Sequence, residues 1–253
     1  MSQTAREAKK SGEGGAWEII RVFIHALILA FLVRTFAYQP FNIPSGSMKS
    51  TLLVGDYLFV SKFSYGYSRY SLPFSPPLFS GRIWTGLPER GDVAVFKLPT
   101  NNSTDYIKRV IGLPNDRIQV IDGVLHINGE AVKREKTDDF TETDAAGNVT
   151  RIQRYVETLP NGVSYDTLDI YSASFGDNTR EYVVPEGHYF MMGDNRDNST
   201  DSRFLSDVGY VPLENFVGRA EVIFFSIDGS AQFWQVWKWP TSIRWSRLLD
   251  GVG

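Results

Sequence analysis

The hydrophobic pattern changes near residue 38 and divides the chain into two unequal parts. Residues 22–33 form an apolar run, VFIHALILAFLV, in which His25 is the single polar member. Extended to residues 17–38, the segment has 22 residues and would measure about 33 Å as a helix. That length is close to the roughly 20 residues that cross a bilayer, and Trp17 and Tyr38 suit the two interfaces. The pattern predicts one transmembrane helix over residues 17–38.

Other interpretations of this segment differ in what the apolar residues contact. A removable signal peptide is disfavoured, because RTFAYQP follows at once without a small-x-small cleavage site. An interfacial helix is an alternative, since Glu18, Arg21 and His25 recur at helical spacing and form a polar stripe. A buried helix of a soluble protein is the third interpretation, and the sequence leaves both alternatives open.

The basic residues are distributed unevenly on the two sides of this segment. Arg6, Lys9 and Lys10 precede it, whereas Arg34 and Lys49 are the basic residues close behind it. The positive-inside rule then places residues 1–16 in the cytoplasm as a short tail. Residues 39–253 are expected on the extracytoplasmic side.

Beyond Pro40 the helical period gives way to short runs of alternating polar and apolar residues. Asp122-Gly123 and Asn128-Gly129 are strong signals for tight hairpin turns between such runs. The pattern predicts a mostly β fold, an antiparallel β-sheet domain with strands near residues 57–63, 93–98, 106–113, 117–121, 124–127, 154–158, 189–193 and 220–227.

Two stretches interrupt this β pattern. Residues 66–90 combine four prolines with several aromatic residues, which predicts a long loop that exposes apolar side chains. Residues 135–178 are rich in Thr, Asp, Asn and Gly and show few strong strands, which predicts an inserted, smaller β-rich subdomain.

Composition narrows the classes of function. With 26 Lys and Arg against 29 Asp and Glu, the net charge of −3 argues against a nucleic-acid partner. The chain has no cysteine, which excludes disulfides, a cysteine nucleophile and thiolate metal sites. Near the end of the chain, Trp234, Trp237, Trp239 and Trp245 alternate with basic residues. This segment suits a membrane interface or packing on the β domain, and the sequence does not decide between them.

Candidate chemistry begins just after the apolar segment, where Ser45 and Ser47 flank a glycine. A serine in an irregular turn can present its hydroxyl beside backbone N–H groups, as a nucleophile with an oxyanion hole requires, although Ser-Gly-Ser alone usually forms a polar loop. The histidines are poor bases here, since His25 lies in the apolar run and the other two follow hairpin patterns. Lys108 lies among Ile and Val residues, where burial would lower its pKa and supply a neutral base; otherwise it is an exposed strand lysine.

A third unusual string is GDNRDNSTDSR at residues 193–203. Its carboxylates suggest a calcium loop, but Arg196 and Ser199 fall where ligands should be. We therefore predict a loop held by ion pairs, in which Asp197 or Asp201 pairs with Arg196 or Arg203.

Three strings in this order, behind an apolar N-terminal segment, closely resemble the motifs of bacterial type I signal peptidases. They are PSGSM at 44–48, RGDVAVFKLP with YIKRVIGLPND between 90 and 116, and GDNRDNSTDSR at 193–203. The resemblance implies a membrane-anchored endopeptidase that removes signal peptides from secretory preproteins after small residues. It would be a single-pass protein of the bacterial cytoplasmic membrane, in contact with lipid and without a metal or other cofactor.

The resemblance also assigns roles to individual residues. It implies Ser47 as nucleophile, Lys108 as general base, and an oxyanion hole formed by the Ser45 hydroxyl and the Ser47 N–H. Ser199 would orient the lysine, and Asp201 and Arg203 would support the site electrostatically. The positions that match the lining of the substrate pockets are Ile43, Met48, Leu52, Tyr106 and Ile107.

One position departs from the family pattern, and two other classes of function stay open. Many members read SMxPTL, whereas this chain has Ser50 in place of the proline, which is expected to alter the rigidity of the turn without removing a catalytic group. A self-cleaving repressor shares the Ser-Lys arrangement but should begin with a DNA-binding helix-turn-helix. An inert, membrane-tethered β domain that binds peptides is the other alternative.

Overall fold

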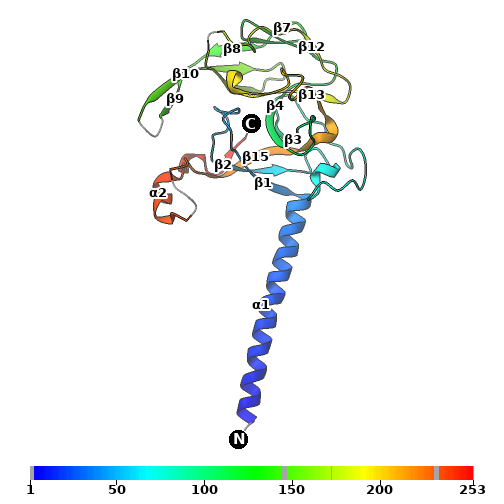
Figure 1. Cartoon of the computed structure of the whole chain (residues 1–253), viewed down its shortest axis with the longest axis vertical. Coiled ribbons are helices and arrows are strands. Elements are labelled where there is room, and N and C mark those ends of the chain that lie inside the picture. Colours follow the sequence, from blue (N-terminus) through cyan, green and yellow to red (C-terminus); the bar gives the residue numbers. More distant parts are fainter. Residues whose placement is uncertain (1–2, 144–146, 172, 231–233, 253) are drawn as a thin grey trace.

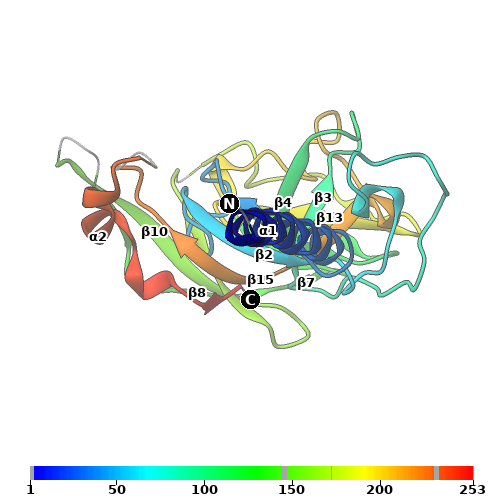
Figure 2. The same ribbon diagram turned by 90° about the horizontal axis from the view of Figure 1, so that it is seen from below.

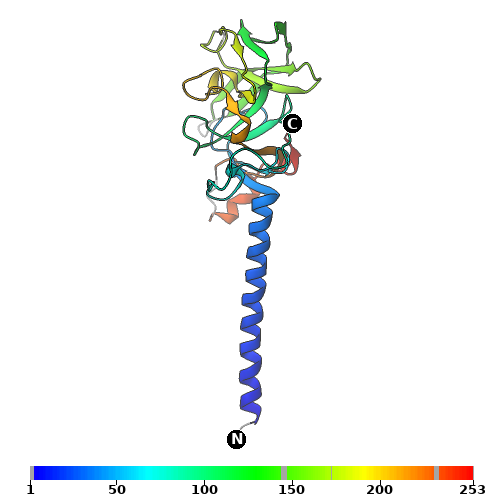
Figure 3. The same ribbon diagram turned by 90° about the vertical axis from the view of Figure 1, so that its right-hand side faces the viewer.

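A long helix and a β domain make up the computed structural model, which describes residues 3–143, 147–171, 173–230 and 234–252. Helix α1 (Gln3–Phe36) projects away from one end of the β domain (Figures 1 and 3). Its part Trp17–Phe36, 20 residues long, is almost wholly exposed and is apolar enough to cross a membrane. Because α1 is one continuous helix, residues 3–36 contain no helix-turn-helix, and a repressor-type protein loses its support.

The helix predicted over residues 17–38 is present, but its ends differ from the prediction. The helix stops at Phe36, and Tyr38 already belongs to β1 (Tyr38–Asn42), where it pairs with Ser61. Proline disfavours helical backbone at the preceding residue, so Pro40 helps to end the helix here. At the other end, the helix begins at Gln3, so the polar residues before Trp17 continue the same helix.

The largest sheet is antiparallel throughout and supports the candidate site. Its strand order is β1, β2 (Asp56–Ser61), β15 (Phe216–Ser226), β3 (Val93–Lys97), β4 (Asp105–Gly112), β13 (His188–Met192) and β14 (Val211–Pro212), and β16 (Asp250–Gly251) pairs with β15. The prediction of a mostly antiparallel β fold is confirmed. Four successive antiparallel pairings separate β1 from β4, so these two strands run in the same direction.

Two smaller sheets lie at the end of the domain farthest from α1 (Figure 1). One has the order β12 (Tyr182–Val183), β5 (Arg117–Ile121), β6 (Val124–Ile127) and β7 (Glu130–Ala131). The other has the order β11 (Ser164–Asp169), β10 (Val149–Thr158) and β8 (Lys133–Lys136), with β9 (Phe140–Thr143) paired to β10. Positive φ at both residues of Asp122-Gly123 and of Asn128-Gly129 confirms the two predicted hairpin turns.

Strands β8 to β11 are more regular than the composition of residues 135–178 suggests. The ten-residue strand β10 pairs with three partners, and the sheet starts at Lys133, slightly before the predicted segment. The expectation of few strong strands is therefore wrong. Cross-strand pairing stabilises Thr-rich strands whose apolar alternation is weak.

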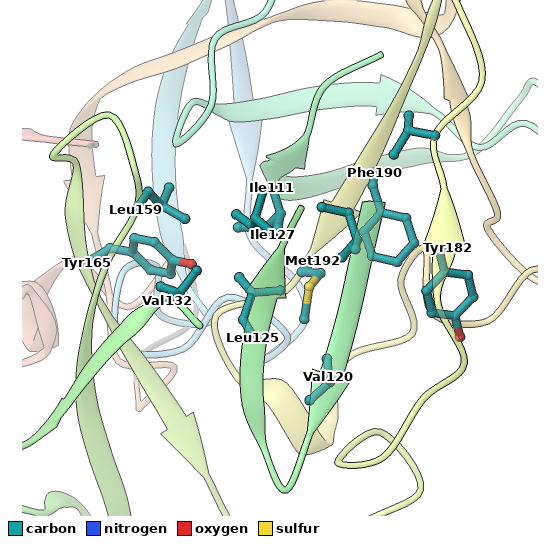
Figure 4. Close-up of a cluster of buried hydrophobic side chains, with 12 residues drawn as sticks. Ile111, Val120, Leu125, Ile127, Val132, Leu159, Tyr165, Tyr182, Phe190 and Met192 are labelled. Atoms are coloured by element: carbon teal, nitrogen blue, oxygen red, sulfur yellow. The ribbon is translucent and has the colours of Figure 1, made fainter. Parts of the chain in front are cut away.

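Buried apolar side chains gather in three clusters, and one of them joins the main sheet to the smaller sheets. Figure 4 shows one cluster, in which Ile111 of β4 and Phe190 and Met192 of β13 meet side chains from the smaller sheets. A second cluster lies beneath the turn that carries Ser47 and includes Met48 and Leu52. Both clusters hold β4 and the serine turn in fixed positions.

Irregular segments border the end of the domain from which α1 emerges. Residues 66–90 contain one 3-10 turn (Arg69–Ser71) and otherwise follow the predicted loop, while the short helix α2 (Trp239–Ser242) lies on the other side of α1 (Figure 2). Trp237 and Trp245 are 70% and 60% exposed, whereas the ring of Trp239 packs against Phe225. The tryptophan segment thus combines packing on the β domain with exposed rings.

Candidate active site

Ser47 and Lys108 lie side by side although 61 positions separate them in the sequence. Ser47 is in the tight turn after β1, and Lys108 extends from β4. The Lys108 Nζ and the Ser47 Oγ are 2.6 Å apart in a hydrogen bond, and the same amine donates to the Ile107 carbonyl at 3.0 Å. Both side chains are buried, with 3% exposure for Lys108 and 8% for Ser47. The structure brings the predicted nucleophile and base together.

The surroundings of Lys108 favour its neutral form. Burial lowers the pKa of this amine from 10.5 to about 8, because the charged form loses its hydration. The carboxylates of Asp201 and Asp194 act in the opposite direction, and the Arg203 charge acts with burial. A pKa near 8 leaves a useful fraction of neutral amine at physiological pH, as a general base requires.

The Ser45 hydroxyl and the Ser47 backbone N–H are the two hydrogen-bond donors next to the Ser47 hydroxyl. The Ser45 Oγ lies 3.5 Å from the Ser47 Oγ. Asn195 holds the turn by donating its backbone N–H to the Ser47 carbonyl and its side-chain amide to the Gly46 carbonyl. Within the described parts of the chain the Ser47 N–H donates to no acceptor, so it is available to a developing oxyanion.

Asp201 is the centre of a buried hydrogen-bond network next to the dyad of Ser47 and Lys108. It accepts hydrogen bonds from the Gly193 N–H, the Ser199 hydroxyl and the Arg203 guanidinium, all at 2.8 to 3.0 Å. Burial alone would raise the pKa of this carboxyl, but the Arg203 charge and these hydrogen bonds hold its pKa below the usual value. The predicted ion pair between Asp201 and Arg203 is confirmed.

The expected contact between Ser199 and Lys108 does not occur in the structure. Among the described residues, Lys108 bonds to Ser47 and Ile107, while the Ser199 hydroxyl donates to Asp201 at 2.8 Å. Ser199 nevertheless lies close to the turn that carries Ser47, because both residues pack against Gly193. A Cβ atom added to Gly193 would lie 2.2 Å from the Ser199 Oγ and 2.5 Å from the Ser47 carbonyl oxygen. The link from Ser199 to the base therefore passes through Asp201, whose charge raises the lysine pKa.

Other ion pairs of this loop differ from those predicted. Arg196 pairs with the buried Glu157 of β10, and Asp197 accepts the backbone N–H groups of Ile170 and Tyr171. These partners lie far away in the sequence, so the local string could not reveal them.

In the described residues no group of three or more His, Asp or Glu side chains is placed to hold a metal ion.

A further buried ion pair, which the sequence did not reveal, joins Arg109 to Asp194. Arg109 follows Lys108 on β4 and binds Asp194 through two hydrogen bonds of 2.9 and 2.8 Å. Both side chains are 1% exposed, and the guanidinium lies over the Tyr165 ring at 4.2 Å. The pair joins β4 to the loop at 193–203 and thus fixes the base relative to its supporting network. A charged residue beside Lys108 in an apolar strand was the one available signal.

A cleft of about 530 Å³ opens in front of the dyad. Strand β1 contributes one wall of the cleft and β4 contributes the other. These strands are four pairings apart in the main sheet, and they line the same cleft because the sheet is curled. The residues that line it include the predicted Ile43, Tyr106 and Ile107, and also Phe41, Asn42, Val95, Thr104, Asn198 and Thr200, which the sequence did not signal.

Two predicted pocket residues lie elsewhere. Met48 and Leu52 are fully buried in the apolar cluster beneath the serine turn and do not line the cleft. The turn is closed by a hydrogen bond from the Leu52 N–H to the Met48 carbonyl, and both side chains belong to the same buried cluster as Leu58 and Val60. Their assignment to the substrate pocket is therefore wrong for this structure.

A serine hydroxyl against a buried amine, beside a cleft of peptide size, is the arrangement of a serine hydrolase. The model of one family, described as signal peptidase, peptidase S26, matches residues 16–225. The chain therefore belongs to the signal peptidase family S26, whose members are serine endopeptidases that cleave signal peptides from preproteins.

Individual relatives agree with this assignment. A signal peptidase I of Rickettsia typhi is 45% identical over 249 residues, which are 91% of this chain and 91% of the relative. A signal peptidase I of Rickettsia conorii is 45% identical over 212 residues, covering 81% of this chain and 77% of the relative. A solved signal peptidase I of Enterococcus faecalis is 26% identical and covers 53% of this chain and 96% of its own, but its TM-score of 0.32 is too low to support the fold.

Proposed function

We propose that this chain is a membrane-anchored signal peptidase in which Ser47 is the nucleophile and neutral Lys108 is the general base. The observation that carries the proposal is the 2.6 Å contact between the lysine amine and the serine hydroxyl. It is supported by the burial of Lys108, which lowers its pKa to about 8.

The first chemical step forms an ester between the enzyme and the signal peptide. The Ser47 Oγ attacks the scissile carbonyl carbon and its proton moves to the Lys108 Nζ. The negative charge on the carbonyl oxygen is held by the Ser45 hydroxyl and the Ser47 N–H. Lys108 then gives the proton to the leaving nitrogen, and the peptide bond breaks.

The second step releases the signal peptide and restores the enzyme. A water molecule attacks the ester carbonyl, and its proton moves to the neutral Lys108. The ester bond breaks, and the Ser47 oxygen recovers a proton from the lysine. One base thus serves both steps.

The substrate is expected to lie as an extended strand between β1 and β4. These strands run in the same direction. β1 is an edge strand, and β4 pairs with β13 only from Arg109 onward, so residues 105–108 leave a backbone edge open to the cleft where a peptide can add to the sheet. Branched side chains such as Ile43 and Ile107 narrow the cleft next to Ser47, which favours small residues before the cut. The backbone hydrogen bonds of the added strand would supply affinity for the peptide, and the narrow cleft would select small residues before the cut.

The anchor would place this chemistry at the membrane surface. We infer that Trp17–Phe36 spans the bacterial cytoplasmic membrane, with residues 1–16 in the cytoplasm and residues 39–253 outside. Residues 66–90 and the short helix α2 lie on opposite sides of α1 when the ribbon is seen from below (Figure 2). The exposed aromatic side chains of residues 66–90 and of the tryptophan segment would contact lipid there. Confining enzyme and preprotein to one surface raises their effective concentration. Residues 135–178 would form a subdomain inserted into the peptidase domain, away from the membrane.

Cleavage of a secretory preprotein by the purified full-length protein tests the proposed chemistry. We expect Ser47→Ala and Lys108→Met to abolish cleavage, while Lys133→Met, which removes an exposed lysine of β8, keeps full activity. Circular dichroism of each variant reports whether the fold is intact. Cleavage by a folded Lys108→Met protein at the normal rate would refute the dyad, and a folded wild-type protein that binds preprotein without cutting it would favour the inert-domain alternative.

A further inference from the structure

A second cavity lies where α1 meets the β domain. Its volume is about 510 Å³, and it adjoins the active-site cleft, with which it shares Phe41 and Asp105. Arg34 from the last turn of α1, Lys62 after β2 and Lys97 at the end of β3 all line it. Three elements thus bring three cationic side chains to one cavity.

The positive charge of this cavity is only partly neutralised. Lys97 pairs with Asp105 at 2.9 Å. Lys62 is 2% exposed, and its amine donates to the Ser71 carbonyl at 2.5 Å, a neutral partner. In the described parts of the chain, neither Arg34 nor Lys62 forms an ion pair with a carboxylate. Burial, followed by repulsion from Arg34, lowers the pKa of Lys62 to about 8, and a nearby anion would reverse this effect.

The position of the cavity suggests where such an anion comes from. Arg34 lies in the last turn of α1, where the proposed span would meet the bilayer surface. Phe31, one turn earlier, and the fully exposed Phe74 line the same cavity, so apolar rings border its cations. Cations next to an apolar wall match a phospholipid, whose phosphate adjoins its acyl chains.

We propose that this cavity binds the phosphate group of an anionic phospholipid, held by Arg34 and Lys62 at the outer end of the membrane helix. The site rests on the proposed anchor and does not depend on the proposed chemistry. Guanidinium and ammonium groups both donate strong, charge-assisted hydrogen bonds to phosphate oxygens. A lipid in this position would hold the neighbouring cleft at the level of the headgroups.

Lipid binding to the full-length protein tests the site without reference to cleavage. The inactive Ser47→Ala protein is purified in a neutral detergent and titrated with phosphatidylglycerol or with phosphatidylcholine, and bound lipid is counted by native mass spectrometry. We expect phosphatidylglycerol to be retained in preference, and Arg34→Gln and Lys62→Met each to weaken its binding about fivefold. Arg21→Gln, nearer the other end of the span, and Lys133→Met should leave binding unchanged.

The outcomes separate this site from its alternatives. Lys62→Arg keeps the charge and should keep binding, and the exposed Arg34 tests the site even where a substitution at the buried Lys62 disturbs folding. Equal retention of the two lipids by the Ser47→Ala parent, or unchanged binding in Arg34→Gln, would overturn the proposal. Inorganic phosphate that displaces phosphatidylglycerol at equal concentration would assign the cavity to free phosphate instead. Failure here leaves the serine-lysine chemistry intact, because no arm measures cleavage.

Discussion

Ser50 adopts a φ of +89° and donates its hydroxyl to the Asp166 carbonyl of β11 at 2.8 Å. The bond ties the serine turn to the smaller sheet, and the adjacent Lys49 adds an ion pair of 2.6 Å to Glu142 of β9. Proline is confined to a φ near −65°, so it does not fit the backbone found here. The expectation that Ser50 changes only the rigidity of the turn is therefore incomplete, because it also permits this connection.

Replacing Ser50 by the proline common in the family should destabilise this protein. We expect Ser50→Pro to lower the free energy of unfolding by about 1–3 kcal/mol, since the backbone must leave its left-handed conformation. Ser50→Ala loses only the hydrogen bond and should cost about 1 kcal/mol. Thermal unfolding of the full-length variants in detergent measures the difference. A Ser50→Pro protein that unfolds at the wild-type temperature or above would contradict this account of the turn.

The features that local patterns encode were predicted correctly from the sequence. Alternating residues define a strand within a few positions, and Asp122-Gly123 and Asn128-Gly129 specify their turns through their own backbone preferences. The roles of Ser47 and Lys108 came from the family resemblance, because neither residue is distinctive alone. Their contact joins two strings far apart in the chain.

The predictions that were wrong concern contacts between residues that are far apart in the chain. Met48 and Leu52 follow the nucleophile closely, and only the folded turn shows that they point into the core. Arg196 had nearby carboxylates in its own loop, yet it pairs with Glu157 of β10, which supplies a buried partner. A single sequence carries no information about such pairings.

Substitutions at Leu52 and Ile107 distinguish a core residue from a pocket residue. Leu52→Ala should lower stability by about 2–5 kcal/mol, because it leaves a cavity in a fully buried cluster, and should not change substrate preference. Ile107→Ala widens the cleft and should improve cleavage after residues larger than alanine. Thermal unfolding and a panel of preproteins with different residues before the cut measure the two effects. Relaxed preference with normal stability in Leu52→Ala would restore Leu52 to the pocket.

The buried pair of Arg109 and Asp194 should matter more for stability than any exposed ion pair. Asp194→Asn leaves a guanidinium that is 1% exposed without its counter-charge, and we expect a loss of about 3–5 kcal/mol. Glu135→Gln breaks the exposed pair with Lys133 and should cost less than about 1 kcal/mol. Equal unfolding temperatures for the two variants would show that Arg109 is stabilised by other contacts.

Lys108→Met should stabilise the protein while it removes activity. The pKa of Lys108 is about 8 in the folded state against 10.5 when unfolded, so burial of its charge opposes folding fully below about pH 8. The penalty disappears as pH rises through 10.5, above which the amine is neutral in both states. Near neutral pH we expect Lys108→Met to gain about 1–3 kcal/mol, and the gain should shrink in alkaline buffer. Lys133→Met is the matched control, and a loss of stability in Lys108→Met would contradict the argument.

The pH dependence of cleavage reports the protonation of the base directly. Because attack requires neutral Lys108, kcat/KM should rise about tenfold per pH unit on the acidic side and level off above about pH 8. Asp201→Asn removes a charge that raises the lysine pKa, so in a folded variant this limb should move to lower pH. Initial rates of preprotein cleavage at subsaturating substrate, in buffers of constant ionic strength, measure both profiles. A limb near the value of about 10.4 for free lysine, or one that Asp201→Asn moves to higher pH, would show that burial of Lys108 does not set the pH dependence of cleavage.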